Sequence, residues 1–302
     1  MFIIYNEAIE KAMREDPYIP PPSALTLTAT TDNSSVKLIK EGTLSNEFEV
    51  NVGNGWEAYT FDTVIPLNAG QSCKWRCSAH PTTQGILNYV KFVMTGTIEA
   101  SGSCNSMLSS DFENLTSLSG YDFALTRLFQ GCASLTKPPL LPATTLSRTC
   151  YFYMFQYCTG LTQAPVLPAT MLAYDCYNSM FGNCTSLAES PALPATALAA
   201  GCYRFMFEGC TSLTKAPVLL ATTLANSCYK GMFDGCSSLN EVRCQMPSSY
   251  SSDDVVSYAE TWLEGVSATG TFHTNEDANW TSGASGIPTG WTRLPLSEYP
   301  TT

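Results

Sequence analysis

Hydrophobic residues recur through the middle of the chain with a fixed period of 26 residues, and no residue is gained or lost across four intervals. The columns that mark this period most clearly are Phe129, Phe155, Phe181, Phe207 and Phe233, followed by Cys132, Cys158, Cys184, Cys210 and Cys236. A period of about 20–50 residues is typical of stacked repeats, in which each unit buries its apolar side against its neighbours. We therefore expect a scaffold whose function lies on its surface.

Each repeat unit divides into an extended half and a half with helical spacing. Leu161, Ala164 and Val166 follow a short, Pro-containing spacing that predicts a strand of about three residues. Cys150 and Cys158 lie eight residues apart with a Met midway, which predicts a short helix with these side chains on one face. Stacked coils of this kind would place like residues on like residues, at the strand spacing of about 4.8 Å.

The end of each unit resembles the BspA-type leucine-rich repeat, with its Phe-x-Gly-Cys-x-Ser-Leu signature. That signature stands in this chain at Phe129–Leu135, Phe207–Leu213 and Phe233–Leu239. The chain is similar in particular to Leu-Pro-Ala-Thr-Thr-Leu repeat proteins of gut Bacteroides and their phages, over about residues 115–245. The departures are Leu220 in place of Pro, and Tyr157 and Asn183 in place of Gly. The resemblance implies a leucine-rich-repeat solenoid, here assigned to residues 101–244.

Residues 24–100 alternate between apolar and polar positions, which predicts short strands. The expected strands are Leu25–Ala29, Val36–Ile39, Phe48–Val50, Trp56–Phe61, Ser72–Cys77 and Tyr89–Met94. They indicate an antiparallel β-sandwich-like module, similar to the one that precedes such repeats in the same family. With the helix expected in each coil, the predicted fold class is α+β.

Both ends of the repeat are expected to carry caps. Phe112–Leu118 echoes Phe129–Leu135 at a 17-residue offset, which predicts a shortened first coil within residues 101–128. Residues 245–302 are expected to form the C-terminal cap, with a helix near Asp253–Leu263.

Residues 1–23 form a separate leader: an amphipathic segment over residues 2–16, then a Pro-rich linker. We expect an anchor helix that docks on a partner or on a neighbouring copy, giving a homo-oligomer in the second case; the alternative is a disordered leader. The proposed anchor residues are Phe2, Ile3, Ile4, Ile9 and Met13. The opening apolar run has five residues and no basic region before it, so no signal peptide is expected.

Composition limits the partners. Charged residues are only 14% of the chain and the formal net charge is −11, which argues against nucleic acid, because phosphate binding needs clustered Lys and Arg. No apolar run reaches the length of about 18 residues that a membrane span needs.

Ten of the thirteen Cys, all but Cys73, Cys77 and Cys104, follow the repeat. Eight residues of helix separate two Cys by about 12 Å, whereas a disulfide needs Cα atoms within about 7 Å. We therefore expect buried thiols that act as small apolar fillers.

Catalytic and metal chemistry finds little support. Cys73, Cys77 and His80 would give three metal ligands, but the two Cys alternate on a strand and no fourth ligand is evident. His273 is expected in a turn of the cap. The acidic pairs Asp253-Asp254 and Glu276-Asp277 are expected as solvated charges at a helix start or in a loop. No cofactor, metal site or enzymatic activity is predicted.

Recognition is expected in the repeat columns that vary, because constant columns serve stacking. Aromatic residues and Arg are the usual anchors of interfaces, which selects five candidates among the variable positions; the alternative is neutral drift. These candidate binding residues are Phe152, Tyr153, Tyr174, Arg204 and Phe205.

The expected function is therefore a non-enzymatic display or adhesion protein. The first setting is a phage virion, where the leader attaches to other virion proteins and the solenoid meets a host surface protein or glycan. The second is a cell-surface adhesin of a gut Bacteroides. The third is a glycan-active enzyme, which the presence of only two His disfavours.

Overall fold

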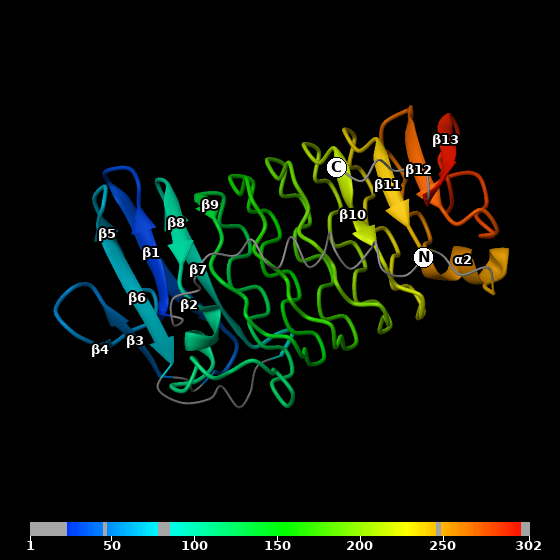
Figure 1. Cartoon of the computed structure of the whole chain (residues 1–302). Helices are drawn as coiled ribbons and strands as arrows, with labels where there is room; N and C mark the ends of the chain where they lie inside the picture. The colour runs from blue at the N-terminus through cyan, green and yellow to red at the C-terminus, as the bar shows by residue number, and fades with distance from the viewer. Residues whose placement is uncertain (1–22, 45–46, 78–84, 246–248, 297–302) are drawn as a thin grey trace.

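The computed structural model describes residues 23–44, 47–77, 85–245 and 249–296. Three parts follow one another along the chain: a module of β-strands, a stack of turns in the middle, and a parallel sheet at the far end (Figure 1). The described residues are therefore β-rich, and the expected leader helix over residues 2–16 lies outside them.

The N-terminal module contains two antiparallel sheets, with strand orders β4-β3-β6-β1-β8 and β5-β2-β7. Its strands are β1 (Leu25–Ala29), β2 (Ser34–Glu41), β3 (Phe48–Asn51), β4 (Glu57–Ala58), β5 (Ile65–Leu67), β6 (Ser72–Cys77), β7 (Tyr89–Thr95) and β8 (Ile98–Ser101). Side chains alternate between buried and accessible along β1 and β6, which is the pattern that predicted them. Trp75 on β6 meets Phe92 on β7 with ring centroids 5.1 Å apart, so the two sheets share a core. The strand expected over 56–61 is reduced to β4.

The module runs directly into the stack. Strand β8 pairs in parallel with β9 (Leu135–Lys137), with Ile98 opposite Leu135. The Phe92 ring stacks on Phe129 with centroids 5.4 Å apart, and the Cys132 thiol donates to the Phe92 carbonyl at 3.1 Å. The first member of the Phe column is thus covered by a strand of the module.

The sequence predicted a shortened first coil in which Phe112–Leu118 aligns with Phe129–Leu135. The structure does not align these two segments. The Leu118 amide donates to the Thr145 carbonyl at 2.8 Å, and Ser117 bridges Thr145. Leu118 therefore lies beside Thr145, not in the column of Leu135. The two segments are similar in residue type, but backbone hydrogen bonds determine which residues lie side by side in neighbouring coils.

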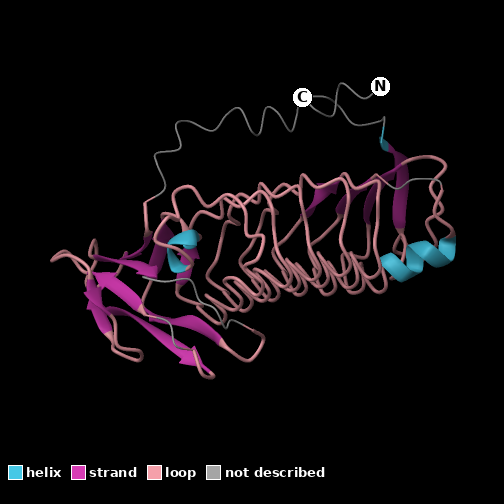
Figure 2. Ribbon diagram, turned by 90° about the horizontal axis from the view of Figure 1, so that it is seen from below, coloured by secondary structure: helices cyan, strands magenta, loops and turns pink. Residues whose placement is uncertain are grey.

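Successive coils are joined by backbone hydrogen bonds that repeat every 26 residues. The amides of Phe155, Phe181 and Phe207 each donate at 2.9 Å to the carbonyl of the Met one coil further on. The amides between them bond within their own coil, three residues back, as Met154 does to the Tyr151 carbonyl at 3.1 Å. Alternate amides thus hold the coil together and join it to its neighbour. The coils follow one another in a row of loops in Figure 2.

The short helix expected in every coil is wrong. Thr149, Tyr153 and Tyr157 have φ of 57°, 56° and 62°, and an α-helix requires negative φ at every residue. Positive φ recurs at the equivalent positions of later coils, at Asp175, Ser179, Asn183, Gly201, Phe205, Gly209, Ser227, Gly231 and Gly235. This backbone buries side chains with a four-residue period, which over two turns looks like the 3.6-residue period of a helix. Within the described residues, the helical elements are a 3-10 turn, η1 (Cys104–Met107), and one α-helix, α2 (Ser252–Tyr258).

The strand expected at the start of each coil forms only near the ends of the stack, as β9 and as β10 (Lys215–Leu219). The described coils that begin at Leu161 and Leu187 have no strand there. A Pro stands in each of these segments, at 165 and 191, but the equivalent Pro217 lies within β10, so the Pro alone does not account for the missing strands.

Columns of identical side chains fill the core of the stack. The rings from Phe129 to Phe233 lie 5.4–5.6 Å apart, with interplanar angles of 2–9°. A second column, from Tyr151 to Tyr229, has spacings of 5.8–6.2 Å. Trp262 closes both columns and stacks on Trp280 at 4.9 Å. The core is therefore continuous from the module to the far end.

The Cys column does more than fill space. All thirteen Cys are buried, as expected for the repeat thiols. The thiols of Cys158, Cys184, Cys210 and Cys236 each donate to the carbonyl of a Phe in the preceding coil, at 2.9–3.1 Å. The coil has no helical rise, so the expected distance of about 12 Å between two Cys of one coil is wrong. The thiols are nevertheless free and buried, as expected.

The far end of the stack is a parallel sheet of β10, β11 (Glu241–Cys244), β12 (Gly270–Thr274) and β13 (Trp291–Pro295). Helix α2 begins where Asp253-Asp254 predicted a helix start. The Ser251 hydroxyl donates to Asp254 at 2.7 Å and holds the pKa of that carboxyl below its ordinary value. No helix among the described residues is long and apolar enough to cross a membrane.

Candidate binding surface

Several columns of side chains that vary between coils lie in the turn segments, which we call the turn face: residues 122–131, 148–157, 174–183, 200–209 and 226–235. In the four rows from 148–157 onward, one Cys, one Tyr, one Met and one Phe are buried in the core, and the first row buries Ala124, Leu125, Leu128 and Phe129 instead. Positions such as Tyr153, Tyr157 and Tyr174 remain at least partly accessible. The backbone found in place of the expected helix thus leaves the variable side chains accessible to solvent, with one row of them in each coil.

One cluster on the turn face surrounds Arg127. Its guanidinium carbon lies 4.5 Å from the Tyr153 ring, 5.3 Å from Tyr89 and 5.9 Å from Phe152. The same side chain donates to Gln130 at 2.8 Å. A guanidinium within about 6 Å of an aromatic ring is attracted to the ring quadrupole. Arg127 therefore ties a module strand, through Tyr89, to the first coils of the stack.

A second cluster is more open and lies one row further along. The Arg148 guanidinium carbon is 5.6 Å from the Tyr174 ring and 6.0 Å from Phe123. Tyr174 is 50% exposed and Arg148 is exposed. No hydrogen bond or ion pair joins the Arg148 side chain to another described residue, so its five N–H donors remain available to a ligand.

The five residues selected from the sequence do not form one site. The rings of Phe152 and Tyr153 are in contact, with centroids 3.9 Å apart. Phe152 is only 9% exposed, and its ring packs near the Arg127 guanidinium. Tyr174 belongs with Arg148. Arg204 lies over Phe205 at 5.1 Å, two coils from Tyr153.

Phe205 leans away from the two clusters. Its ring covers Gly231, where a Cβ would come within 2.1 Å of a ring carbon. The position therefore needs Gly for space as well as for its φ of 59°. Phe205 is half-buried as a result, and it contributes less accessible area than Tyr174.

Sequence reasoning missed Arg127, Phe123 and Tyr89. The first two stand one coil before Tyr153 and Thr149, so extending the variable columns backward by one period would have found them. Tyr89 comes from β7 of the module, and nothing in the repeat indicates that it meets Arg127. Arg148 stands in a variable column, but only its structural neighbours Tyr174 and Phe123 distinguish it.

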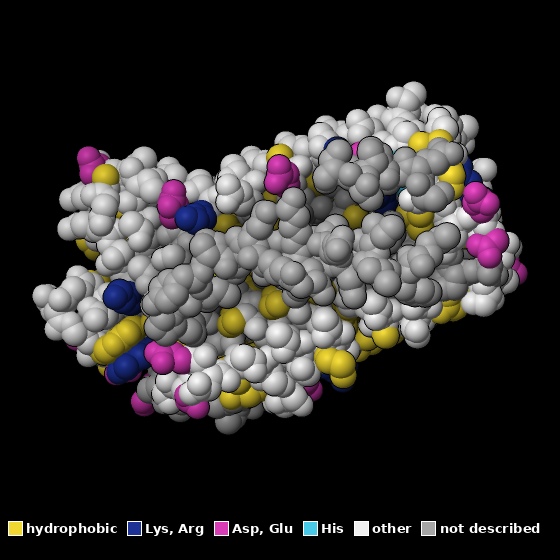
Figure 3. Space-filling model, in the orientation of Figure 1, with side chains coloured by type: hydrophobic (Ala, Val, Ile, Leu, Met, Phe, Trp, Pro, Cys, Tyr) yellow, Lys and Arg dark blue, Asp and Glu magenta, His cyan; other side chains and the backbone are white. Residues whose placement is uncertain are grey.

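Charge is divided along the turn face. The two Arg clusters lie at its start, whereas Glu208, Asp234 and Glu264 follow one another in a column toward the far end. Burial, and then the charge of Asp234, raise the pKa of Glu208; burial, and then Glu264, raise the pKa of Asp234. Lys230 pairs with Glu260 at 2.6 Å nearby. On the face drawn in Figure 3, charged side chains are few and scattered.

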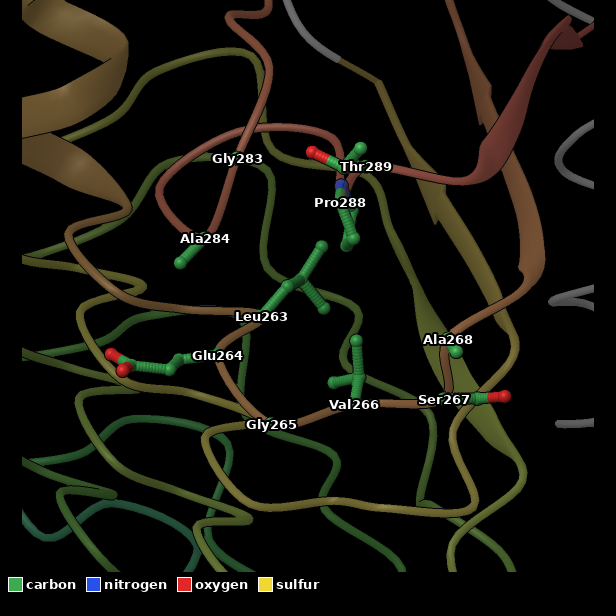
Figure 4. Close-up of a pocket in the computed structure, with 10 residues that line it drawn as sticks. All are labelled: Leu263, Glu264, Gly265, Val266, Ser267, Ala268, Gly283, Ala284, Pro288 and Thr289. Carbon is green, nitrogen blue, oxygen red and sulfur yellow. The ribbon is translucent and has the colours of Figure 1, made fainter.

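A hollow of about 220 Å³ lies in the C-terminal cap, between the 263–268 segment and the 283–289 loop (Figure 4). Its lining residues are Leu263, Glu264, Gly265, Val266, Ser267, Ala268, Gly283, Ala284, Pro288 and Thr289. Glu264 is the one ionisable side chain among them. Acid–base or nucleophilic chemistry needs a second positioned group, so this lining gives no catalytic arrangement.

The remaining residues that the sequence offered as possible metal ligands or catalytic groups do not form a site in the described part of the chain. Cys73 and Cys77 point into the module core from β6, and burial raises the pKa of the Cys73 thiol to about 12; His80 lies outside the described residues. His273, expected in a turn, is instead buried within β12. Glu276-Asp277 is exposed in a turn, as expected. In the described part of the chain no three His, Cys, Asp or Glu side chains group in a way that could hold a metal.

The anchor candidates Phe2, Ile3, Ile4, Ile9 and Met13 all lie outside the described residues. Comparison with known proteins adds no relative: no family model matches the chain, and neither a curated protein nor a solved structure matches it.

Proposed function

We propose that the chain is a BspA-type leucine-rich-repeat solenoid that recognises a host surface protein or glycan through its turn face, without catalysing a reaction. The observation that carries the proposal is the Arg148–Tyr174 pair, an exposed guanidinium over a half-exposed ring. Arg and Tyr are enriched among the residues that dominate binding energy. A guanidinium that has no hydrogen-bond or ion-pair partner among the described residues suits a carboxylate or a row of hydroxyls.

The scaffold supports this role because it fixes the row spacing. Side chains one coil apart are held by the same ladder of backbone hydrogen bonds and stacked rings. Binding residues on a rigid array lose little conformational entropy when a ligand arrives. The Arg127 cluster, next to the Arg148 cluster, extends the candidate surface toward the module.

The proposed setting is a virion surface, where the protein would serve in decoration or host attachment. The N-terminal segment would attach to other virion proteins. The alternative setting is the surface of a gut Bacteroides cell. Mass spectrometry of purified phage particles and of washed cell surfaces separates the two: recovery of the chain with intact particles supports the first, and its recovery only with cells overturns it.

The double variant Arg148→Ala/Tyr174→Ala tests the site. We expect binding to host cells or immobilised gut glycans to fall by about 30-fold or more, which is the loss of a hot spot of about 2 kcal/mol. The melting temperature should stay within about 2 °C, because both side chains are at the surface. The matched control, Gln163→Ala/Thr214→Ala, changes two exposed residues of the extended half and should bind normally.

Protease or periodate treatment of the host surface then identifies the ligand class. Loss of binding after protease indicates a protein, and loss after periodate indicates a glycan. Unchanged binding of the Arg148→Ala/Tyr174→Ala variant would refute the assignment of this site.

A further inference from the structure

The extended half of each coil carries a row of outward apolar side chains, which we call the apolar strip: Leu140, Val166, Ala192 and Val218. Val166 is 75% exposed and Leu140 is 43% exposed. The strip belongs to a different half of the repeat from the turn face, so it is not part of the binding surface described above.

The strip is bordered by polar side chains. Four positions further along each coil stands a Thr, and all four are exposed: Thr144, Thr170, Thr196 and Thr222. One position is therefore apolar in four consecutive coils, exposed in the first three and half-buried at Val218, while the position four residues later is polar in all four. A continuous apolar row of this kind on a protein surface usually marks a place where something packs.

The described chain begins at one end of this strip. The Ser103 amide donates to the Ser23 carbonyl at 2.8 Å, and the Leu140 amide donates to the Gly102 carbonyl at 2.8 Å. Ala24 bridges Ser103, and Ser103 in turn bridges Leu140. Ser23, where the described chain begins, is therefore two backbone rungs from the first member of the apolar strip.

The segment before Ser23 has the length and the side chains to cover the strip. Its 22 residues span at most about 75 Å when extended. The strip is only about 15 Å long, because three coil intervals of about 4.8 Å separate Leu140 from Val218. The segment contains Phe2, Ile3, Ile4, Ile9 and Met13, which are enough apolar side chains to cover four positions. Four Pro, at positions 17, 20, 21 and 22, stand between these apolar side chains and Ser23 in the sequence.

We propose that residues 1–22 pack on the apolar strip of their own chain. The contact goes beyond the anchoring role expected of the leader. The same apolar residues cannot lie on the strip and on a partner at once, so docking on a particle would uncover the strip. Within the free protein the contact would remove Val166 and Leu140 from water.

Photo-crosslinking of the full chain tests the contact directly. With benzoylphenylalanine in place of Val166, we expect crosslinked peptides from residues 1–22, all within a monomer on a denaturing gel. The same probe in place of Thr170, in the same coil but in the polar row, should give no such peptides. Crosslinks that join two copies would show that a second chain covers the strip, and the absence of crosslinks to residues 1–22 would show that the leader does not; either result overturns the proposal.

Limited trypsin digestion gives a second, independent measurement, because Lys11 and Arg14 are cleavage sites inside the leader. A charge on the strip should release the segment, so Val166→Asp is expected to raise the cleavage rate at these sites about tenfold. Thr170→Asp is the matched control and should leave the rate unchanged. Equal rates in wild type and Val166→Asp would contradict the contact, and the melting temperature of each variant verifies that the stack remains folded.

Discussion

Raising the pH above about 9 is expected to unfold the protein, because the fold holds a set of thiols in the protonated state. Burial raises the pKa of five of them from the ordinary value of 9.0 to about 12. These thiols are Cys73, Cys132, Cys176, Cys210 and Cys228. Above about pH 9 the unfolded chain releases protons that the folded chain retains, so the unfolded state binds fewer protons and the free energy of unfolding falls.

The expected loss is large. Each such thiol contributes stability in full below about pH 9, and this is lost at up to about 1.4 kcal/mol per pH unit as the pH rises toward 12. Five thiols together remove about 7 kcal/mol per pH unit, against a typical total stability of about 5–15 kcal/mol. The remaining Cys and the buried Tyr column, whose pKa values burial also raises, act in the same direction.

Urea unfolding followed by circular dichroism between pH 7 and 11 measures this slope. The variant Cys132→Ser/Cys210→Ser is the control: it removes two of the twelve thiols whose pKa burial raises, so the slope just above pH 9 should fall by about one-sixth. A free energy of unfolding that stays constant up to about pH 11 would mean that the thiols are not buried as described.

Replacing Phe181 with Ala should cost about 3–5 kcal/mol, which for most domains is a large part of the total stability. Phe181 is fully buried in the middle of the column, and its ring stacks at 5.6 Å on Phe155 and on Phe207. Removing it leaves a cavity lined by rings that the hydrogen-bonded coils cannot close. Thermal and urea unfolding monitored by circular dichroism report the change.

Phe205→Ala is the matched control, since it removes the same side chain from the same region but from a half-buried position on the turn face. It should cost about 1 kcal/mol. Equal losses at the two positions would argue against a column of stacked Phe rings as the core.

The sequence predicts the position of every core column, because stacking makes the same residues recur at one interval. Phe155, Phe181 and Cys184 are fully buried, as the period indicates. The strands of the module were found because one buried face imposes strict alternation, as in β6. The period and the alternation both follow from burial, which a hydrophobic pattern records directly.

The backbone of the turn face could not be predicted in the same way. Burial every fourth residue is common to a helix and to this backbone, and only φ distinguishes them. Tyr153, Tyr157 and Phe205 adopt positive φ, although nothing in these residue types favours it. The neighbouring coil selects this conformation, because it supplies acceptors for the amides that a helix would bond within itself.

The sequence predicted only part of the candidate site. The variable columns identified Tyr174, and the structure adds that Arg148 lies over its ring. Phe152 met the same criteria yet proved to be buried behind Arg127. Variation between coils marks positions that stacking leaves free, but whether a free side chain reaches solvent depends on its neighbours in the next row.

The 26-residue coils stack in register and bury their Phe and Cys columns. Deleting residues 187–212 removes one whole coil, whereas deleting residues 187–199 removes half of one and shifts every later column. The stack predicts cooperative unfolding and unreactive thiols for the first protein, and reactive thiols without a cooperative transition for the second. Thiol reactivity with a colorimetric disulfide reagent, measured on both proteins without denaturant, tests this most directly; equal reactivity in the two would contradict the stacked register.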